Sequence, residues 1–239
     1  MKSLHRKDIK REMNIVISGS SKGLGLELSK VFLSNGHYVI GISRGESSEF
    51  HNQNYRHFEV DISSQEKVMS ISKILGNIPI DIVINNAGMS GSGRKIEEVE
   101  NREIQDLLDV NLFGSLNLVR AFLEKLKLGR GKRIINISSR FGSLSFNQEE
   151  ENRKLKISYS YRISKASQNM LAVCLSNDLA DYGIIVDVIH PGSFVGGCGR
   201  SDATDDPSKI ASMIYQWIES GQTSSLPRMK EIGGREFDW

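Results

Sequence analysis

Residues 14–25 read NIVISGSSKGLG, an apolar, β-branched run that passes directly into a turn with glycines at positions 19, 23 and 25. An amphipathic stretch, Leu24–Ser34, follows, so the glycines join a predicted strand to a predicted helix. Glycine has no Cβ and permits a tight turn close to a bound group, while a helix N-terminus offers free N–H groups to an anion. A plain left-handed turn would also use glycine, but the position between strand and helix favours a diphosphate-binding turn.

Short β-branched runs alternate with longer amphipathic stretches along the rest of the chain. Runs of successive apolar residues are typical of parallel strands that are covered on both faces. The predicted strands are Asn14–Ser18, Tyr38–Ser43, Tyr55–Glu59, Ile80–Asn85, Arg133–Ser138 and Ile184–His190, and the predicted helices are Leu24–Ser34, Gln65–Leu75, Asn101–Leu126 and Tyr161–Tyr182. This order predicts an α/β fold of the Rossmann type, a doubly wound parallel sheet with helices on both faces in three layers.

Length and composition fit one globular domain. A chain of 239 residues holds one sizeable core but not two ordinary domains with linkers. We therefore predict a short basic N-terminal extension, residues 1–12, and a single domain over residues 13–239. The net charge of +2 gives no electrostatic reason to expect binding to nucleic acid or to a membrane surface. No run of about 18 apolar residues occurs, so a transmembrane helix is not expected.

The N-terminus and the cysteines indicate the compartment. The first twelve residues are basic with no apolar segment behind them, which excludes a secretory signal; a basic address tag is the alternative to a frayed extension. Neither cysteine has the C-x-x-C spacing of a redox or metal site. We expect Cys174 to be a small core residue and Cys198 to lie in an exposed glycine-rich loop. The sequence thus predicts no metal site and a reducing, cytoplasmic location.

Two segments interrupt the regular alternation. Phe146–Ser158 contains a run of Glu, Asn, Arg and Lys side chains and is interpreted as a solvated insertion. Val195–Asp206 is rich in Gly, Ser and Asp and is interpreted as a mobile loop. Both flank the presumed active site described below.

Three further motifs follow the glycine turn in order along the chain. Asn85-Asn86-Ala87-Gly88 ends the fourth predicted strand, Ser139-Arg140-Phe141-Gly142 follows the fifth, and Tyr161 stands four residues before Lys165 at the start of a predicted helix. This series resembles the short-chain dehydrogenase/reductase family, single-domain type, whose motifs are T-G-x-x-x-G-x-G, N-N-A-G, S-x-x-G and Y-x-x-x-K. The resemblance covers residues 14–192, and Ser18 replaces the usual threonine while keeping its hydroxyl.

The resemblance implies a nicotinamide dinucleotide laid across the glycine turn. The cofactor contacts that it predicts are Gly19, Ser21, Lys22, Gly23, Leu24, Gly25, Arg44, Asp61, Ile62, Asn86, Ala87, Gly88, Tyr161, Lys165, Pro191 and Gly192. An acid at the end of the second strand would bind the ribose hydroxyls and repel a 2′-phosphate, but Ser43 is followed here by Arg44. Arginine presents a planar fork of donors to phosphate, and Lys22 is a second cation, so NADP(H) is predicted over NAD(H). The alternative is that both cations only face water.

Two of the predicted cofactor contacts have a second interpretation. By resemblance, Asp61 binds the adenine amino group and Ile62 supplies adjoining backbone, but Asp61 is equally suited to cap the helix that follows it. Pro191-Gly192 resembles the family's turn beside the nicotinamide carboxamide, which often continues to a threonine. Residues 194–197 read FVGG and hold none, so that hydrogen bond is missing or comes from backbone.

Tyr161 and Lys165 suit proton transfer to and from an oxygen. Residues four apart lie on one helical face, so the phenol and the ammonium can point into one cleft. A free tyrosine, with a pKa of about 10, is a poor base at neutral pH, and a neighbouring ammonium lowers that pKa. Tyr161 is therefore predicted to be the general acid in carbonyl reduction and the base in alcohol oxidation. Tyr159 is not equivalent, because Ile163 stands four residues on.

Two further catalytic residues follow from the resemblance. Ser139 is expected to be the second donor to the substrate oxygen, with Ser138 as the alternative. Asn111 matches the family's helix asparagine, which supports a proton-relay water near the lysine; the alternative is a helix-bend or surface residue. Ser139 and Tyr161 stand 22 positions apart, against a dozen or so in most relatives. The insertion must therefore loop out and is expected to border the substrate entrance, unless it displaces the serine.

The predicted function is an NADP(H)-dependent oxidoreductase that interconverts a small-molecule carbonyl and an alcohol by hydride transfer. The alternative is an NADP(H)-binding regulatory or scaffold protein with little or no turnover, although a pure binder needs no tuned phenol. A sugar-nucleotide epimerase or dehydratase is disfavoured, because fewer than 50 residues follow Gly192. The resemblance also implies a homodimer or homotetramer formed through Asn101–Leu126 and Tyr161–Tyr182.

Overall fold

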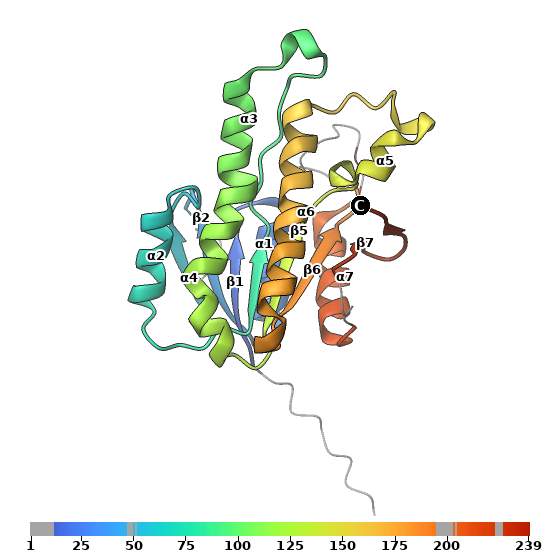
Figure 1. Cartoon of the computed structure of the whole chain (residues 1–239). Coiled ribbons are helices and arrows are strands. Elements are labelled where there is room, and N and C mark those ends of the chain that lie inside the picture. The colour runs from blue at the N-terminus through green and yellow to red at the C-terminus, as the bar shows by residue number, and fades with distance from the viewer. Residues whose placement is uncertain (1–11, 47–49, 51, 195–202, 204, 223–226) are drawn as a thin grey trace, which may run out of the picture.

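The computed structural model describes residues 12–46, 50, 52–194, 203, 205–222 and 227–239. Its centre is an eight-stranded sheet in the order β3-β2-β1-β4-β5-β6-β7-β8 (Figure 1). The strands are β1 (Asn14–Ser18), β2 (Tyr38–Ser43), β3 (Tyr55–Glu59), β4 (Ile82–Asn85), β5 (Arg133–Ile137), β6 (Ile185–His190), β7 (Met229–Glu231) and β8 (Glu236–Phe237). The helices are α1 (Gly23–Ser34), α2 (Gln65–Ile74), α3 (Asn101–Leu108), α4 (Ser115–Leu128), α5 (Leu144–Gln148), α6 (Tyr159–Leu179) and α7 (Pro207–Glu219), with short helical turns η1 (Ile96–Glu98), η2 (Asp109–Gly114), η3 (Arg140–Gly142), η4 (Glu150–Asn152) and η5 (Ala180–Tyr182).

The strand order confirms the predicted doubly wound parallel sheet. β1 pairs in parallel with both β2 and β4, and parallel pairing continues outward to β3 on one side and β7 on the other. Only β8, among the described strands, runs antiparallel, against β7. The chain order therefore reverses between β1 and β4, and at such a switch point the carboxyl ends of the strands leave a crevice for a ligand.

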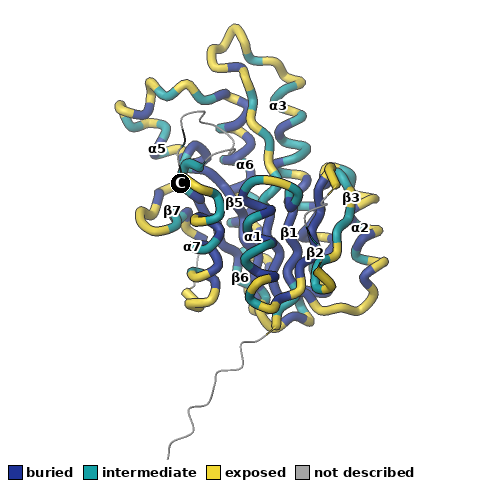
Figure 2. Tube along the Cα trace, turned by 180° about the vertical axis from the view of Figure 1, so that it is seen from behind, coloured by how far each residue is buried: buried dark blue, intermediate teal, exposed yellow. Residues whose placement is uncertain are grey.

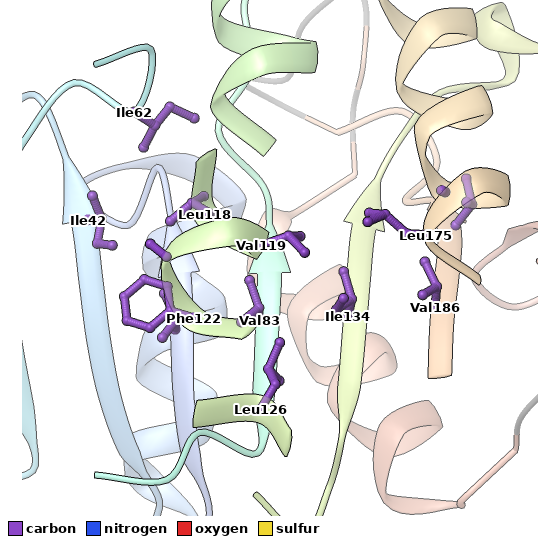
Figure 3. Close-up of a cluster of buried hydrophobic side chains, with 14 of the residues drawn as sticks. Ile42, Ile62, Val83, Leu118, Val119, Phe122, Leu126, Ile134, Leu175 and Val186 are labelled. Carbon is purple, nitrogen blue, oxygen red and sulfur yellow. The ribbon is translucent and has the colours of Figure 1, made fainter. Parts of the chain in front are cut away.

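Helices cover both faces of the sheet and form two separate cores. On one face, α2, α4 and α6 pack on the strands, and Figure 3 shows Val119, Phe122 and Leu126 of α4 around Val83 of β4. On the other face α1 and α7 pack together on the sheet. The central strands β1, β5 and β6 are mostly dark blue in Figure 2, because they are buried from both sides. Each fully buried large side chain of this kind stabilises the fold by about 1.5–3 kcal/mol.

The predicted helix over residues 101–126 is three segments rather than one. α3 passes into the π-helical turn η2, Asp109–Gly114, and α4 then runs two residues further, to Leu128. A π-turn holds one extra residue per turn, which a helical hydrophobic pattern does not reveal. β4 begins at Ile82 rather than Ile80, and the carboxylate of Asp81 before it accepts hydrogen bonds from the backbone N–H groups of Asn14, Arg130 and Gly131.

Two helices, α5 and α7, and two strands were not predicted. α7 begins where Asp206 accepts a hydrogen bond from the N–H of Ser208, with Pro207 at the first helical position, a common helix start. Its isoleucines at 210, 214 and 218 are buried at four-residue spacing. β7 and β8 are too short for an alternating pattern to identify them.

The predicted insertion Phe146–Ser158 is solvated only in part. Its Glu and Lys side chains are mostly exposed, but Phe146 is buried, with its ring centroid 5.8 Å from that of Phe141 and 5.8 Å from that of Phe237. The segment includes the end of α5 and the turn η4. An ion pair also connects the segment to the residue before β8, because Glu149 lies 3.1 Å from the guanidinium of Arg235.

Several expectations concern single positions. The prediction that Cys174 is a core residue is wrong: it is exposed, because the inward face of α6 is formed by Ala172, Leu175 and Leu179. The N-terminal extension up to residue 11, Cys198 and most of the loop Val195–Asp206 lie outside the described residues. Within the part of the chain that the structure describes, no helix is long and apolar enough to cross a bilayer.

Candidate active site

Two cavities adjoin at the carboxyl edge of the sheet, beside the switch point between β1 and β4. The larger has a volume of about 700 Å³ and is lined by the glycine turn and by the ends of β2, β3 and β4. The smaller, about 90 Å³, is lined by residues after β5, by the first turns of α6 and by the end of β6. Asn86, Gly88 and Phe194 line both, so the two cavities meet along this edge.

Glycine is required at two positions of the first turn. A Cβ on Gly19, which has a φ of +69°, would lie 2.9 Å from the Cα of Ala87. A Cβ on Gly25 would lie 2.2 Å from the carbonyl oxygen of Gly19. Gly25 lines neither cavity, so it serves by letting α1 pack against the turn rather than by facing a ligand.

The hydroxyl of Ser18 joins the glycine turn to the N-N-A-G motif. Its Oγ accepts hydrogen bonds from the N–H groups of Asn86 and Ala87, both at 3.0 Å, and donates to the carbonyl of Ile84 at 3.3 Å. The side-chain amide of Asn86 donates back to the carbonyl of Ser18 at 2.9 Å. The Ser18 hydroxyl therefore makes contacts that a threonine hydroxyl at this position could also make.

Most of the predicted cofactor residues line the larger cavity. They are Gly19, Ser21, Lys22, Gly23, Leu24, Arg44, Asp61, Ile62, Asn86, Ala87 and Gly88. Lys22 and Arg44 are exposed at its border. Asp61 is not the N-cap of α2, because the cap is Ser64; its Oδ1 instead accepts from the N–H of Ser63 at 3.0 Å and holds the preceding turn.

The smaller cavity brings together the predicted catalytic residues Ser139, Tyr161 and Lys165, with Pro191 and Gly192 opposite. Tyr161 and Lys165 lie on successive turns of α6, and Nζ of Lys165 is 6.0 Å from the centroid of the Tyr161 ring. Both side chains are buried. The helix begins at Tyr159, whose exposed ring lines neither cavity, and the Oγ of Ser158 caps it by accepting from the N–H of Tyr161 at 3.2 Å.

The two serines after β5 differ in their contacts. The hydroxyl of Ser138 donates to Oδ1 of Asn169 at 2.6 Å, whereas the Oγ of Ser139 accepts from the N–H of Phe141 at 3.3 Å. Both line the smaller cavity. The 22-residue separation from Tyr161 therefore leaves Ser139 in place, and the described residues of the insertion, 147–157, border neither cavity.

Asn111 lies behind the cavities, within the π-helical turn η2. It is fully buried, so the alternative of a surface residue is wrong. The other alternative, a residue at an irregular point of the helix, agrees with its place in the π-helical turn. Its amide accepts from the N–H of Met89 at 2.8 Å and donates to the Met89 carbonyl at 3.1 Å and to the Oγ of Ser164 at 2.8 Å. Asn111 thus connects the backbone of Met89, in the loop after β4, to the helix α6 that carries Tyr161.

Gln168, which the sequence analysis missed, is fully buried beside Lys165. Nζ of Lys165 donates to Oε1 of Gln168 and to the carbonyl of Ile137, both at 2.9 Å. Nε2 of Gln168 donates to the Oγ of Ser115 at 3.0 Å, and that hydroxyl donates to the carbonyl of Asn111 at 3.0 Å. A polar residue on the inward face of a helix, three positions after Lys165, was the available signal.

Glu103 on α3 is a second residue near the site that the sequence analysis did not identify. Its carboxylate accepts hydrogen bonds from the hydroxyl of Ser160, next to Tyr161, and from the N–H of Ser92 at 2.8 Å. These bonds, first from Ser160 and then from Ser92, lower the pKa of Glu103 to about 2. Glu103 therefore stays ionised at neutral pH and ties the chain around residue 92 to the first turn of α6.

Arg140 and His190 complete the polar wall of the smaller cavity and were also missed as site residues. His190 ends β6 and is 5% exposed. Burial, and secondly the charge of Arg140, lower its pKa to about 3. The His190 ring is therefore neutral at physiological pH.

Comparison with known proteins agrees with this geometry. The family model described as short chain dehydrogenase matches residues 13–205. The C-signal protein of Myxococcus xanthus is 31% identical over 162 residues, which span 67% of this chain and 93% of that protein. The chain spans 46% to 64% of the length of four other curated relatives.

Solved structures share the fold over almost the whole chain. An NADPH-bound carbonyl reductase from chicken fatty liver superposes with a TM-score of 0.81 at 21% identity, over 96% of this chain and all of that one. A short-chain dehydrogenase from Leptospira borgpetersenii with bound NAD⁺ gives 0.77 at 23% identity, over 93% and 91%. With its motifs on one edge of a doubly wound sheet and the family model matched over most of its length, the chain belongs to the short-chain dehydrogenase family.

Proposed function

We propose that the protein is an NADP(H)-dependent oxidoreductase that interconverts a carbonyl and an alcohol, with Tyr161 as general acid and base. The observation that carries this proposal is the meeting of two cavities. Ser139, Tyr161 and Lys165 line the smaller one, and it opens along Asn86 and Gly88 into a cavity large enough for a dinucleotide. Similarity to a carbonyl reductase that binds NADPH supports the same assignment.

The larger cavity fits a dinucleotide diphosphate by its shape and charge. Gly19 and Gly23 line this cavity with backbone alone, and α1 begins at Gly23 with N–H groups that suit an anion. Lys22 and Arg44 add two cations at the border, where a 2′-phosphate would find charge-assisted donors. When bound, a nicotinamide dinucleotide would supply or accept the hydride.

The residues of the smaller cavity would handle the proton and the substrate oxygen. Ser139 would donate a hydrogen bond to that oxygen, and Tyr161 would transfer its phenolic proton to it in reduction or withdraw a proton in oxidation. The ammonium of Lys165 would stabilise the phenolate form of Tyr161. Asn111 would act from behind, by fixing the backbone at Met89 and the helix at Ser164.

The proposal is tested by nucleotide titration followed by a panel of carbonyl compounds. NADPH fluorescence should change saturably on binding, at lower concentrations than NADH requires, and aldehydes or ketones should then be reduced at the expense of NADPH. Binding of NADPH without turnover of any carbonyl or alcohol would instead favour the regulatory or scaffold alternative. No binding of either nucleotide would contradict both functions.

Gln168 is proposed to position Lys165. Gln168→Met keeps the length of the side chain but removes the acceptor, so Lys165 loses one charge-assisted hydrogen bond. We expect kcat to fall about tenfold, and the pH at which alcohol oxidation becomes fast to rise, because the Tyr161 phenolate is less stabilised. The measurement is the pH profile of kcat. An unchanged profile together with a lowered melting temperature would reduce Gln168 to a packing residue.

We also propose, from family membership, that the protein forms a homodimer or homotetramer through α4 and α6. Both helices leave apolar side chains in contact with solvent, including Leu128, Ile163 and Met170. Sedimentation equilibrium measures the mass of the particle. A monomer at micromolar concentration would contradict this part of the proposal.

A further inference from the structure

The smaller cavity contains buried polar atoms that the proton chemistry proposed above does not use. Nε of Arg140 and both ring nitrogens of His190 are buried and have no hydrogen-bond partner among the described residues. Native proteins pair nearly all such atoms, because an unpaired buried donor or acceptor is costly. Arg140 and His190 both line the smaller cavity, so a polar ligand bound there is the candidate partner for these side chains.

Arg140 is a cation that has no acidic partner among the described residues and lies beside two aromatic rings. Its guanidinium carbon lies 5.5 Å and 5.4 Å from the ring centroids of Phe141 and Phe146, so apolar groups support it. No Asp or Glu of the described chain forms an ion pair with it. The described lining of the cavity also contains no acid, although it contains Lys165. The described part of its lining therefore has an excess of positive charge.

His190 adds hydrogen-bonding capacity without adding charge. Because the ring is neutral, one nitrogen donates and the other accepts. Among the described acids, Glu231 is paired with it, but Oε1 of Glu231 is 3.7 Å from Nε2, beyond hydrogen-bond distance. Glu231 borders a different cavity, beyond Pro191 and Gly192. Its carboxylate therefore does not line the space between Arg140 and Tyr161.

We propose that the carbonyl substrate of this enzyme is an oxo acid whose carboxylate is bound by Arg140, with His190 as an additional hydrogen-bond partner. The inference rests on the proposed function and names its substrate class. An arginine fork matches a carboxylate with two parallel hydrogen bonds. Because Ser139 and Arg140 line the same cavity of about 90 Å³, the carboxylate would lie close to the carbonyl.

The experiment compares two probes that differ chiefly in charge, acetoacetate and its methyl ester. Each is titrated by calorimetry into the protein with and without NADP⁺, which cannot deliver a hydride, so binding is measured apart from turnover. Acetoacetate should bind at least about tenfold more tightly than methyl acetoacetate, as expected for a charge-assisted bidentate contact. In Arg140→Met this preference should disappear, whereas Arg140→Lys should retain part of it.

Arg130→Met is the matched control. It removes the same charge from an exposed arginine before β5, at the opposite edge of the sheet, and should leave the preference unchanged. Circular dichroism and a melting curve establish that Arg140→Met is folded; methionine keeps an apolar stem on the two phenylalanine rings. Equal binding of the two probes, tighter binding of the ester, undetectable binding of acetoacetate, or a preference that survives in folded Arg140→Met would each overturn the proposal.

Failure of this inference can be told apart from failure of the proposed function. If NADPH is oxidised by uncharged ketones while acetoacetate binds no better than its ester, the oxidoreductase assignment stands and the oxo-acid assignment is wrong. If acetoacetate binds through Arg140 while no carbonyl compound is reduced, the carboxylate site stands and the proposed catalysis is wrong.

Discussion

Tyr161→Phe should abolish nearly all turnover and leave NADPH binding almost unchanged. The substitution removes only the hydroxyl, so the buried ring still fills its place on α6. General acid–base catalysis by one side chain contributes about 10²–10⁴-fold, and kcat should fall by that factor. The measurement is kcat with NADPH and any carbonyl reduced by the wild type, together with the dissociation constant of NADPH.

Tyr159→Phe is the control for this result. It removes the same hydroxyl two positions earlier, from a side chain that is 42% exposed, and activity should remain near the wild-type value. If Tyr161→Phe retained wild-type kcat, Tyr161 could not be the proton donor. If it lost NADPH binding as well, the hydroxyl would be part of the nucleotide site rather than of the proton transfer alone.

Arg44→Asp should reverse the cofactor preference. Arg44 follows β2 and borders the larger cavity, where a 2′-phosphate would accept its charge-assisted hydrogen bonds. Losing them should weaken NADPH binding roughly 10- to 100-fold, since such bonds contribute about 1.5–3 kcal/mol. An aspartate at this point can accept from both ribose hydroxyls, so NADH binding should improve. The ratio of kcat/KM for NADPH to that for NADH measures the change.

Arg153→Asp makes the same charge change at an exposed position of the insertion that lines neither cavity, and it should leave the ratio as in the wild type. A ratio that did not change in Arg44→Asp would remove Arg44 from the phosphate site. Lys22 would then be the remaining cation of the glycine turn, and Lys22→Glu would be the informative variant.

Much of the fold could be predicted because its strands are local and apolar. β1, β2 and β3 have the predicted bounds, and α1 begins one residue before the predicted helix. These segments are set by β-branched runs and by glycines whose Cβ would clash, which are properties of the sequence itself. The π-turn around Asn111 could not be predicted, because it depends on how α3 and α4 pack rather than on the pattern of either.

The candidate site divides in the same way. Motif residues such as Tyr161 and Lys165 are found by spacing, since four residues make about one helical turn. No sequence spacing identifies Arg140 or His190. They line the same cavity because η3 and the end of β6 lie close together in the fold. Phe146 was interpreted as solvated because charged residues follow it, yet it packs against a strand 91 positions later.

The buried contacts of Gln168 with Lys165 and Ser115 have a direction that chemistry alone determines. An ammonium can only donate, and the peptide oxygen of Asn111 can only accept, so the amide between them must present oxygen to one side and nitrogen to the other. The Ser115 hydroxyl has no choice of rotamer for its proton either. The series is therefore polarised from end to end, and the Asn111 carbonyl keeps this direction whatever the charge on Lys165.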